Sequence, residues 1–239
     1  MGAKYIRGAL VEFMPTILIP LPNVIIFQYN PETMTHTWTQ AESAGGSGPG
    51  QSNPMAVKGR PGESFSFTIA VDASDMIADG SPVAVGIATL SGVYSRLAAL
   101  EMLLYPSGAF DSGLLGTVSS AAGALGGASG GGSASNPSIP ASTLPVVLFV
   151  WGPGRIVPVR VTGLTITEKL YDGFLNPTHA EAQLSLKVLT TDELDALDDK
   201  DPLKDVAITA YSYSQGLRQG LAVANLANAV ESIIGMLPV

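Results

Sequence analysis

Strict alternation of apolar and polar residues is the feature of this chain that most limits its fold. Apolar residues take every second position in residues 180–188, and the same pattern runs through Glu63 to Asp72. Successive side chains of a β-strand point to opposite faces, so this period of two predicts two half-buried strands. We expect one face of these strands to fill a common core, with the residues Phe65, Phe67, Ile69, Leu184, Leu186 and Val188.

Shorter patterns predict the remaining elements. The expected strands are Ala9–Phe13, Asn23–Tyr29, Thr33–Thr39, Val146–Trp151 and Gly163–Glu168. Asp172-Gly173 and Asn176-Pro177 have turn chemistry and separate the last two strands of the chain. Apolar residues at helical spacing predict helices over Ser91–Tyr105 and Gly216–Leu237. Thr190 and Glu193 fit a capping box, which predicts a short acidic helix between them and the tail.

The order of these elements favours a mainly β fold with two parts. Strands do not alternate with helices, which argues against a parallel α/β sheet. We expect residues 1–192 to form an antiparallel β-barrel or sandwich, closed or nearly closed, with one packed helix. A Gly-, Ala- and Ser-rich insertion interrupts it at about residues 107–143, and residues 41–62 have loop composition. Residues 193–239 are expected to form an acidic helix or loop and a C-terminal helical tail.

Composition limits the classes of partner. Charged residues make up 13% of the 239 residues, against about 25% in ordinary soluble chains. A chain with so little charge has little with which to cover its own surface, which favours a subunit whose faces neighbours cover. The net charge is −8 and the 12 Lys and Arg residues are scattered, so nucleic-acid binding is not expected. There are no cysteines, which excludes disulfides and thiolate metal sites.

No pattern predicts catalysis, a metal or a cofactor. His36 and His179 are the only histidines, fewer than the three or four ligands of an ordinary zinc site. A G-x-S-x-G string around Ser129 lies in low-complexity sequence and lacks the strand and helix of a nucleophile elbow. The acidic residues between Asp192 and Asp201 lack the glycine and spacing of a calcium loop. They are interpreted as a solvated face or an electrostatic contact with a basic neighbour.

The ends of the chain predict neither secretion nor a membrane span. Glu12, Pro15 and Pro20 interrupt the apolar stretch that follows Lys4 and Arg7, and no cleavage site follows it. The tail helix is nearly long enough to cross a bilayer, but Arg218 and Glu231 are among the polar residues that interrupt it. Contact of the tail with a partner subunit is the favoured interpretation.

Five segments, in this order, resemble the tube and baseplate proteins of phage-tail-like contractile injection systems. The segments are Phe27–Pro31 (FQYNP), Asp72–Asp75 (DASD), Leu97–Pro106 (LAALEMLLYP), Val147–Gly152 (VLFVWG) and Arg160–Thr190. They are most similar to the tube-initiator type that often carries a LysM module, and the resemblance covers roughly residues 5–192. No LysM module is recognisable after Pro202, where the helical tail stands instead.

This resemblance implies a structural role without catalytic residues. It implies a tube-type β-barrel that assembles as a homo-hexamer. The hexameric ring would join a trimeric VgrG-like spike hub to the inner tube protein ring, beside baseplate wedge proteins. It implies assembly in the cytoplasm into a phage-tail-like particle, with action inside the producing cell or after release on lysis left open. The structural and interface candidates are Phe27, Tyr29, Asn30, Pro31, Trp151, Asn176, Pro177, Leu221, Val230 and Ile233.

A second hypothesis for the function of the chain is an alternative to the ring subunit. The chain could be a β-barrel binding or adaptor module that docks cargo or an envelope component through its C-terminal helix. Deletion of residues 216–239 separates the two, because an adaptor would lose attachment and a ring subunit would lose assembly.

Overall fold

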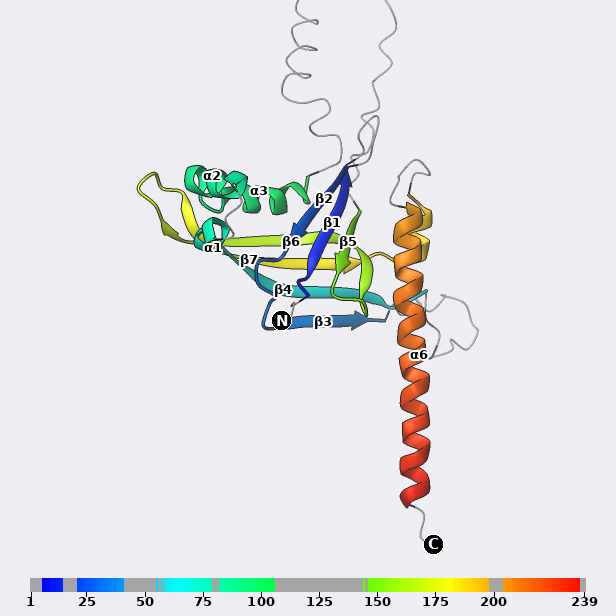
Figure 1. Ribbon diagram of the computed structural model, residues 1–239. Coiled ribbons are helices and arrows are strands. Elements are labelled where there is room, and N and C mark those ends of the chain that lie inside the picture. Colours follow the sequence, from blue (N-terminus) through cyan, green and yellow to red (C-terminus); the bar gives the residue numbers. More distant parts are fainter. Residues whose placement is uncertain are drawn as a thin grey trace, which may run out of the picture.

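The described strands form one antiparallel sheet in the computed structural model of the chain (Figure 1). The structure describes residues 6–14, 21–40, 55, 57, 59–78, 82–105, 144, 146–197 and 204–236, without the side chains of residues 13, 14, 21, 22, 83 and 227–236. The strands are β1 (Ala9–Met14), β2 (Leu21–Ile26), β3 (Met34–Thr39), β4 (Gly62–Asp72), β5 (Val147–Val150), β6 (Ile156–Tyr171) and β7 (Pro177–Val188). The helices are α1 (Ala73–Ala78), α2 (Pro82–Ser91), α3 (Tyr94–Met102), α5 (Thr191–Asp195) and α6 (Lys204–Met236).

The sheet is open rather than closed. Its strand order is β2-β1-β5-β6-β7-β4-β3, and no pairing among the described strands joins β2 to β3. The mainly β, antiparallel fold predicted from the sequence is confirmed, while closure into a barrel is not seen. The sheet instead curls, so that β1, β2 and β5 cross over the other four strands (Figure 1). This curl brings Phe149 of β5 within 5.3 Å and 5.4 Å, ring centre to ring centre, of Phe65 and Phe67 of β4.

The core lies inside this curl. All six residues expected to fill it, from Phe65 in β4 to Val188 in β7, are buried in one cluster. β4 pairs with β7 so that Phe65 lies opposite Leu186 and Phe67 opposite Leu184. The alternating sequence therefore determines which face of the central strands is buried, since a shift of one residue would expose every apolar side chain.

The three helices described between β4 and β5 cover the core at one side. The predicted helix Ser91–Tyr105 corresponds to α3 and is shorter in the structure, since α2 ends at Ser91 and a turn at Gly92 separates it from Tyr94. Helices α1 and α2 have no counterpart in the sequence prediction. Leu97, Leu100 and Leu103 of the α3 region are buried against the strands.

The part of the chain after residue 192 forms a second, smaller apolar cluster with residues that precede it. The predicted capping box is confirmed, with the amide of Glu193 donating to Thr190 Oγ1 and the amide of Thr190 donating to Glu193 Oε2. Leu194 and Ala207 are fully buried beside Val146 and Leu148. Residues on either side of position 192 therefore pack together in this cluster.

Helix α6 begins at Lys204, well before the predicted start at Gly216. Residues 204–215 contain β-branched and Ser residues of modest helix propensity, so the local pattern did not predict them as helical. Their packing against the strands explains the helix, since tertiary contacts override weak propensity. The predicted insertion at 107–143, including Ser129, and most of the predicted loop 41–62 lie outside the described residues.

Candidate functional site and assembly surfaces

The first half of α6 packs against the sheet at the start of β6. Ala207, Tyr211, Ser214 and Arg218 follow one another at spacings of four, three and four residues, so they share one face of the helix. The first three are buried. Ser214 Oγ donates to the carbonyl of Ile156 at 2.6 Å and accepts from its amide at 3.2 Å. These contacts fix α6 to the first residue of β6.

A buried ion pair completes this attachment. The Glu63 side chain is 3% exposed and accepts two hydrogen bonds from Arg218, Nη1 to Oε2 at 2.8 Å and Nη2 to Oε1 at 2.5 Å. His36 Nε2 lies 2.7 Å from Glu63 Oε1. The Arg218 guanidinium also lies over the Trp38 ring, 4.8 Å from its centre. One carboxylate therefore joins β3, β4 and α6.

The surroundings of His36 favour its neutral form. Burial lowers the pKa of the imidazole most, and the nearby Arg155 and Arg218 lower it further, while Glu63 acts in the opposite direction. A neutral imidazole can still donate from Nε2 to the Glu63 carboxylate. The cluster then holds the negative Glu63 between the positive Arg218 and a neutral donor.

Sequence reasoning missed this cluster, although one signal was present. Glu63 shares the parity of Phe65 and Phe67 in the alternating strand, so its side chain points to the buried face. A charged residue at such a position requires a partner. Arg218 is 155 residues away in the chain, and nothing in the sequence links the two.

Of the predicted interface residues, Phe27 lies in the core of the single chain, and the half-buried Trp151 packs against that core. Phe27 is buried and packs against Phe67 and Trp151, with ring centres 5.5 Å and 6.4 Å apart. A side chain at Gly8 would place its Cβ 2.7–2.8 Å from the rings of Trp151 and Phe27. Glycine is needed at position 8 because the two rings occupy the space of a side chain.

The predicted residues Tyr29, Asn30 and Pro31 follow β2. Asn30 holds the segment before β1, and Tyr29 contacts α1. Asn30 Oδ1 accepts from the amide of Gly8 at 2.8 Å, and its Nδ2 donates to the carbonyl of Ile6 at 2.9 Å. The Tyr29 hydroxyl donates to the Asp75 carboxylate of α1, a hydrogen bond that raises the pKa of the phenol. Pro31 is half-buried and leads into β3.

Asn176 and Pro177 join the base of the β6–β7 hairpin to the turn between α2 and α3. Asn176 Nδ2 donates to the carbonyl of Leu90 at 3.2 Å, and the Pro177 carbonyl accepts from the amide of Val93 at 2.9 Å. Gly92 has a φ of 56°, and a Cβ there would lie 2.2 Å from the Pro177 oxygen. Gly92 is therefore required by both its conformation and its neighbour.

The last three predicted residues lie in the outer half of α6. Leu221 is exposed, as are Val223 and Leu226. Val230 and Ile233 belong to the helix, but their side chains lie outside the described residues. Figure 1 shows that this half of the helix runs past the sheet.

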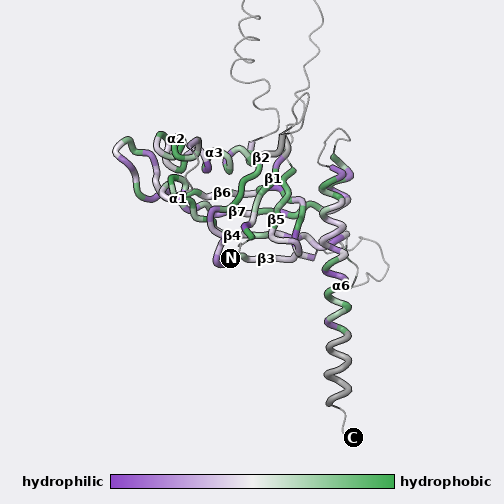
Figure 2. Tube along the Cα trace, in the orientation of Figure 1, coloured by the Kyte–Doolittle hydropathy of each residue, from purple (hydrophilic) through white to green (hydrophobic). Residues whose placement is uncertain are grey.

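The tip of the β6–β7 hairpin projects apolar side chains into solvent. Phe174 is 88% exposed, and Leu170 and Leu175 beside it are also exposed. Figure 2 shows hydrophobic as well as hydrophilic residues along the projecting hairpin. Both leucines have positive φ angles, 55° and 65°, which bulky residues rarely adopt. Asp172 Oδ1 accepts from the amides of Phe174 and Asn176 at 2.8 Å and 2.9 Å, and its pKa is lowered chiefly by its hydrogen bonds with Asn176. The Asp172 carboxylate therefore points into the hairpin loop, and the outer side of the tip is apolar.

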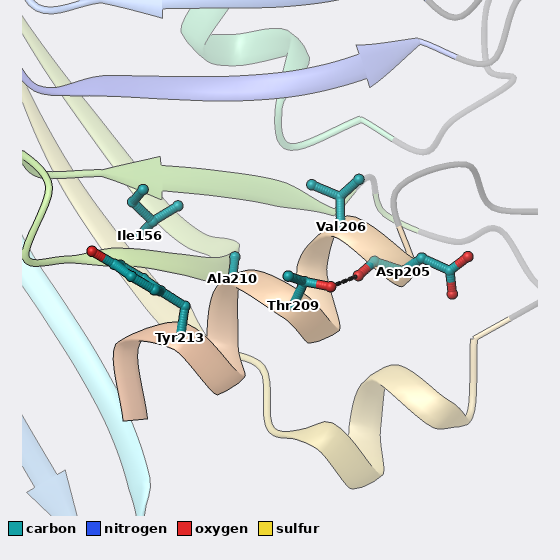
Figure 3. Close-up of a pocket in the computed structure, with 6 residues that line it drawn as sticks. All are labelled: Ile156, Asp205, Val206, Thr209, Ala210 and Tyr213. Atoms are coloured by element: carbon teal, nitrogen blue, oxygen red, sulfur yellow. Dashed lines mark hydrogen bonds between the residues drawn. The ribbon is translucent and has the colours of Figure 1, made fainter. Parts of the chain in front are cut away.

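An apolar hollow lies on α6 at the other end of β6. Val206, Thr209, Ala210 and Tyr213 line it from consecutive turns of the helix, and Ile156 completes it (Figure 3). Its volume is about 470 Å³. The Thr209 hydroxyl donates to the carbonyl of Asp205 at 2.8 Å, so this polar group is satisfied within the helix.

The two outer strands differ in how far other elements cover them. Helix α3 lies beside β2, where Arg96 Nη1 donates to the carbonyl of Ile26 at 3.3 Å. On β3 the exposed face carries Thr35, Thr37 and Thr39, and the strand contains no Lys, Arg, Pro, Asp or Glu. Its one ionisable residue, His36, faces Glu63. The edge of β3 therefore lacks the charges and prolines that commonly prevent strands from pairing.

The described residues show neither a grouped set of metal ligands nor a membrane-spanning helix. In this part of the chain no three His, Asp or Glu residues are grouped as a metal site would require. Among the helices described, none combines the length and apolarity that crossing a bilayer requires. His179 Nδ1 lies 3.2 Å from Asp72 Oδ2, so each of the two histidines has an acidic neighbour.

Comparison with known proteins identifies no family for the chain. It matches no protein-family model, and a search of curated proteins returned no match.

Proposed function

We propose that this chain is a structural subunit of a contractile injection system, a baseplate component forming a hexameric ring that joins the central spike hub to the inner tube. The resemblance of its five sequence segments to tube and baseplate proteins supports this role. So does a curled antiparallel sheet with a helix on it, which is compatible with a tube-type barrel that closes only in the assembly. In this proposal the chain transmits force through subunit contacts and carries out no reaction.

The observation that carries the proposal is the outer edge of β3, which pairs with no further strand among the described residues. Unpaired N–H and C=O groups along a strand edge are a template for another strand. Monomeric proteins usually protect such an edge with charge or proline, and β3 has neither. Pairing with a neighbouring copy would give these backbone groups partners and explain a chain of which only 13% is charged.

The topology specifies how such a junction must run. Every pair in the sheet is antiparallel, so the first and last of its seven strands, β2 and β3, point in the same direction. A head-to-tail ring that continues the sheet from β3 of one copy to β2 of the next therefore needs a parallel pair. Parallel pairs are slightly less stable per residue, so further contacts must support the junction. A two-fold dimer through β3 would instead be antiparallel.

Mass photometry of the purified chain tests the assembly. A ring would have six times the chain mass of 24.6 kDa, alone or in the presence of the spike hub. Replacing Thr35 and Thr37 with Lys should abolish this species, because charge on an edge strand opposes pairing. The matched control replaces Thr165 and Thr167 of the central strand β6 with Lys, because these residues are exposed on the same face of the sheet as Thr35 and Thr37. A persistent monomer that binds no spike hub, or equal assembly of the two double variants, would contradict the proposal.

The second candidate is an adaptor module that docks cargo or an envelope component through α6. The exposed Leu221, Val223 and Leu226, beyond the Arg218 contact, favour this function. Stopping the chain after residue 219 keeps the anchored half of the helix and removes the projecting half. Loss of attachment with intact rings would support the adaptor role, whereas loss of the rings would assign the outer helix to assembly.

A further inference from the structure

We propose that the β6–β7 hairpin tip of one copy inserts Phe174 into the apolar hollow on α6 of the next copy. This inference deepens the ring function proposed above and rests on it. It names two surfaces that are distinct from the β3 edge, and it assigns each of them a partner: the other surface on a second copy of this chain.

The tip is built to present an apolar group. Phe174 is almost fully exposed, although burying an aromatic side chain is strongly favourable. Leu170 and Leu175 hold strained backbone conformations on either side of it. The Asp172 turn and the Asn176–Leu90 contact fix the hairpin from below. A fixed knob of this kind loses little conformational freedom when it binds.

The hollow has the matching chemistry. Its walls come from Val206, Ala210, Tyr213 and Ile156, and the Tyr213 hydroxyl is engaged with the carbonyl of Pro153 at 2.9 Å. Among the described residues of the lining Asp205 alone is charged, and Figure 3 shows its carboxylate directed away from Ile156 and Tyr213. Insertion of Phe174 would therefore leave neither an unpaired charge nor an unsatisfied hydroxyl buried.

The placement of the two surfaces excludes a contact between them within one chain, so the tip that we propose for the hollow belongs to a second copy. Ile156 is the first residue of β6 and Tyr171 the last, so the hollow and the tip lie at opposite ends of one 16-residue strand. At about 3.3 Å per residue the strand spans roughly 50 Å, which no rearrangement of a rigid sheet can close within one chain. Figure 1 shows the hairpin and α6 at opposite ends of the sheet. A knob and a hole on different surfaces make a heterologous contact, which propagates into rings or filaments.

The size of the contact makes the tip an anchor that works together with the β3 edge. An aromatic side chain buries about 150–250 Å², whereas a stable interface needs about 800 Å² from each partner. A central aromatic residue in a fitted pocket commonly dominates binding energy within such an interface. The parallel β3–β2 junction requires support of this kind.

The experiment uses one variant for each surface. Phe174→Asp removes the knob, and Val206→Asp introduces a charge into the hollow at an exposed position in the first turn of α6. Ile87→Asp in α2 and Val223→Asp in outer α6 are matched controls, since both residues are exposed and belong to neither surface. Circular dichroism establishes that all four variants fold, and mass photometry measures their assembly.

We expect Phe174→Asp and Val206→Asp each to weaken self-association at least about 30-fold, as loss of a binding hot spot does, with the controls near wild type. The decisive measurement mixes the two. Each variant keeps the surface that the other lacks, so the mixture should form a one-to-one dimer that grows no further. A mixture that stays at the monomer mass, or assembly of Phe174→Asp equal to wild type, would overturn this inference alone. A wild-type chain that never associates would overturn the ring function with it.

Discussion

Arg218→Met should detach α6 from the sheet, and the structure sets the size of the effect. The substitution keeps an unbranched apolar stem but removes both hydrogen bonds to Glu63 and the cation over Trp38. Glu63 would keep only the contact with His36. Because its side chain is almost wholly buried, its charge would lose most of its compensation.

Breaking a buried ion pair by removal of one partner costs about 3–5 kcal/mol. The Arg218 side chain is 27% exposed, so water can reach part of the space that the guanidinium vacates. We therefore expect the lower end, about 3 kcal/mol of unfolding free energy, or about 6–12 °C in Tm for a chain of this size. Adding Glu63→Gln should recover part of the loss, because the orphaned charge is then gone.

Urea unfolding measures this free energy, and the two tryptophans report on different places. Trp38 lies against Arg218, and Trp151 lies against Phe149 of the core. In the variant the Trp38 signal should change at lower urea than the Trp151 signal, as α6 leaves first; single Trp→Phe variants separate the two. Measurements at one protein concentration keep any contribution from assembly constant.

Lys169→Met is the matched control. Lys169 forms an ion pair with Glu181 whose side chains are 44% and 40% exposed, and such pairs contribute about 1 kcal/mol or less. If Arg218→Met also stays within 1 kcal/mol of wild type, the reasoning fails. Apolar packing around Tyr211 would then hold the helix, and the ion pair would contribute nothing measurable.

Two further predictions concern His36 and Gly92. His36 has a lowered pKa in the folded protein and an ordinary pKa of about 6.5 when unfolded, so below this value the unfolded chain binds more protons. The contribution of His36 to stability is present above pH 6.5 and is lost as the pH falls through the lowered pKa. Between pH 7 and 5 the wild type should therefore lose more unfolding free energy than His36→Gln. Parallel curves of unfolding free energy against pH for the two proteins would refute this. Gly92→Ala should cost about 2 kcal/mol or more, because it combines a left-handed conformation with a clash against Pro177. Gly86→Ala in α2, where a Cβ meets nothing within 4 Å, should instead be neutral or stabilising by up to about 1 kcal/mol in the same urea titration, and similar behaviour of the two variants would contradict the assignment.

The sequence alone determined the central strands, their buried faces and one helix cap. Alternation in β4 and β7 and the Thr190–Glu193 pair are local patterns, and local patterns report which way neighbouring side chains point. Glu63 lay within reach of the same reasoning, as a charge on the buried face. What its partner is could not be derived, because Arg218 comes from a helix 155 residues further along.

Tertiary structure alone decided the strand order, the open edge of β3 and the early start of α6. Strand order depends on which distant segments pair, and periodicity within a segment carries no information about its partner. Residues 204–215 become helical because Ala207, Tyr211 and Ser214 find buried positions against the sheet, a gain that exceeds their modest propensity. The separation of Phe174 from the α6 hollow is likewise a property of the folded sheet, since the length of β6 sets the distance between them.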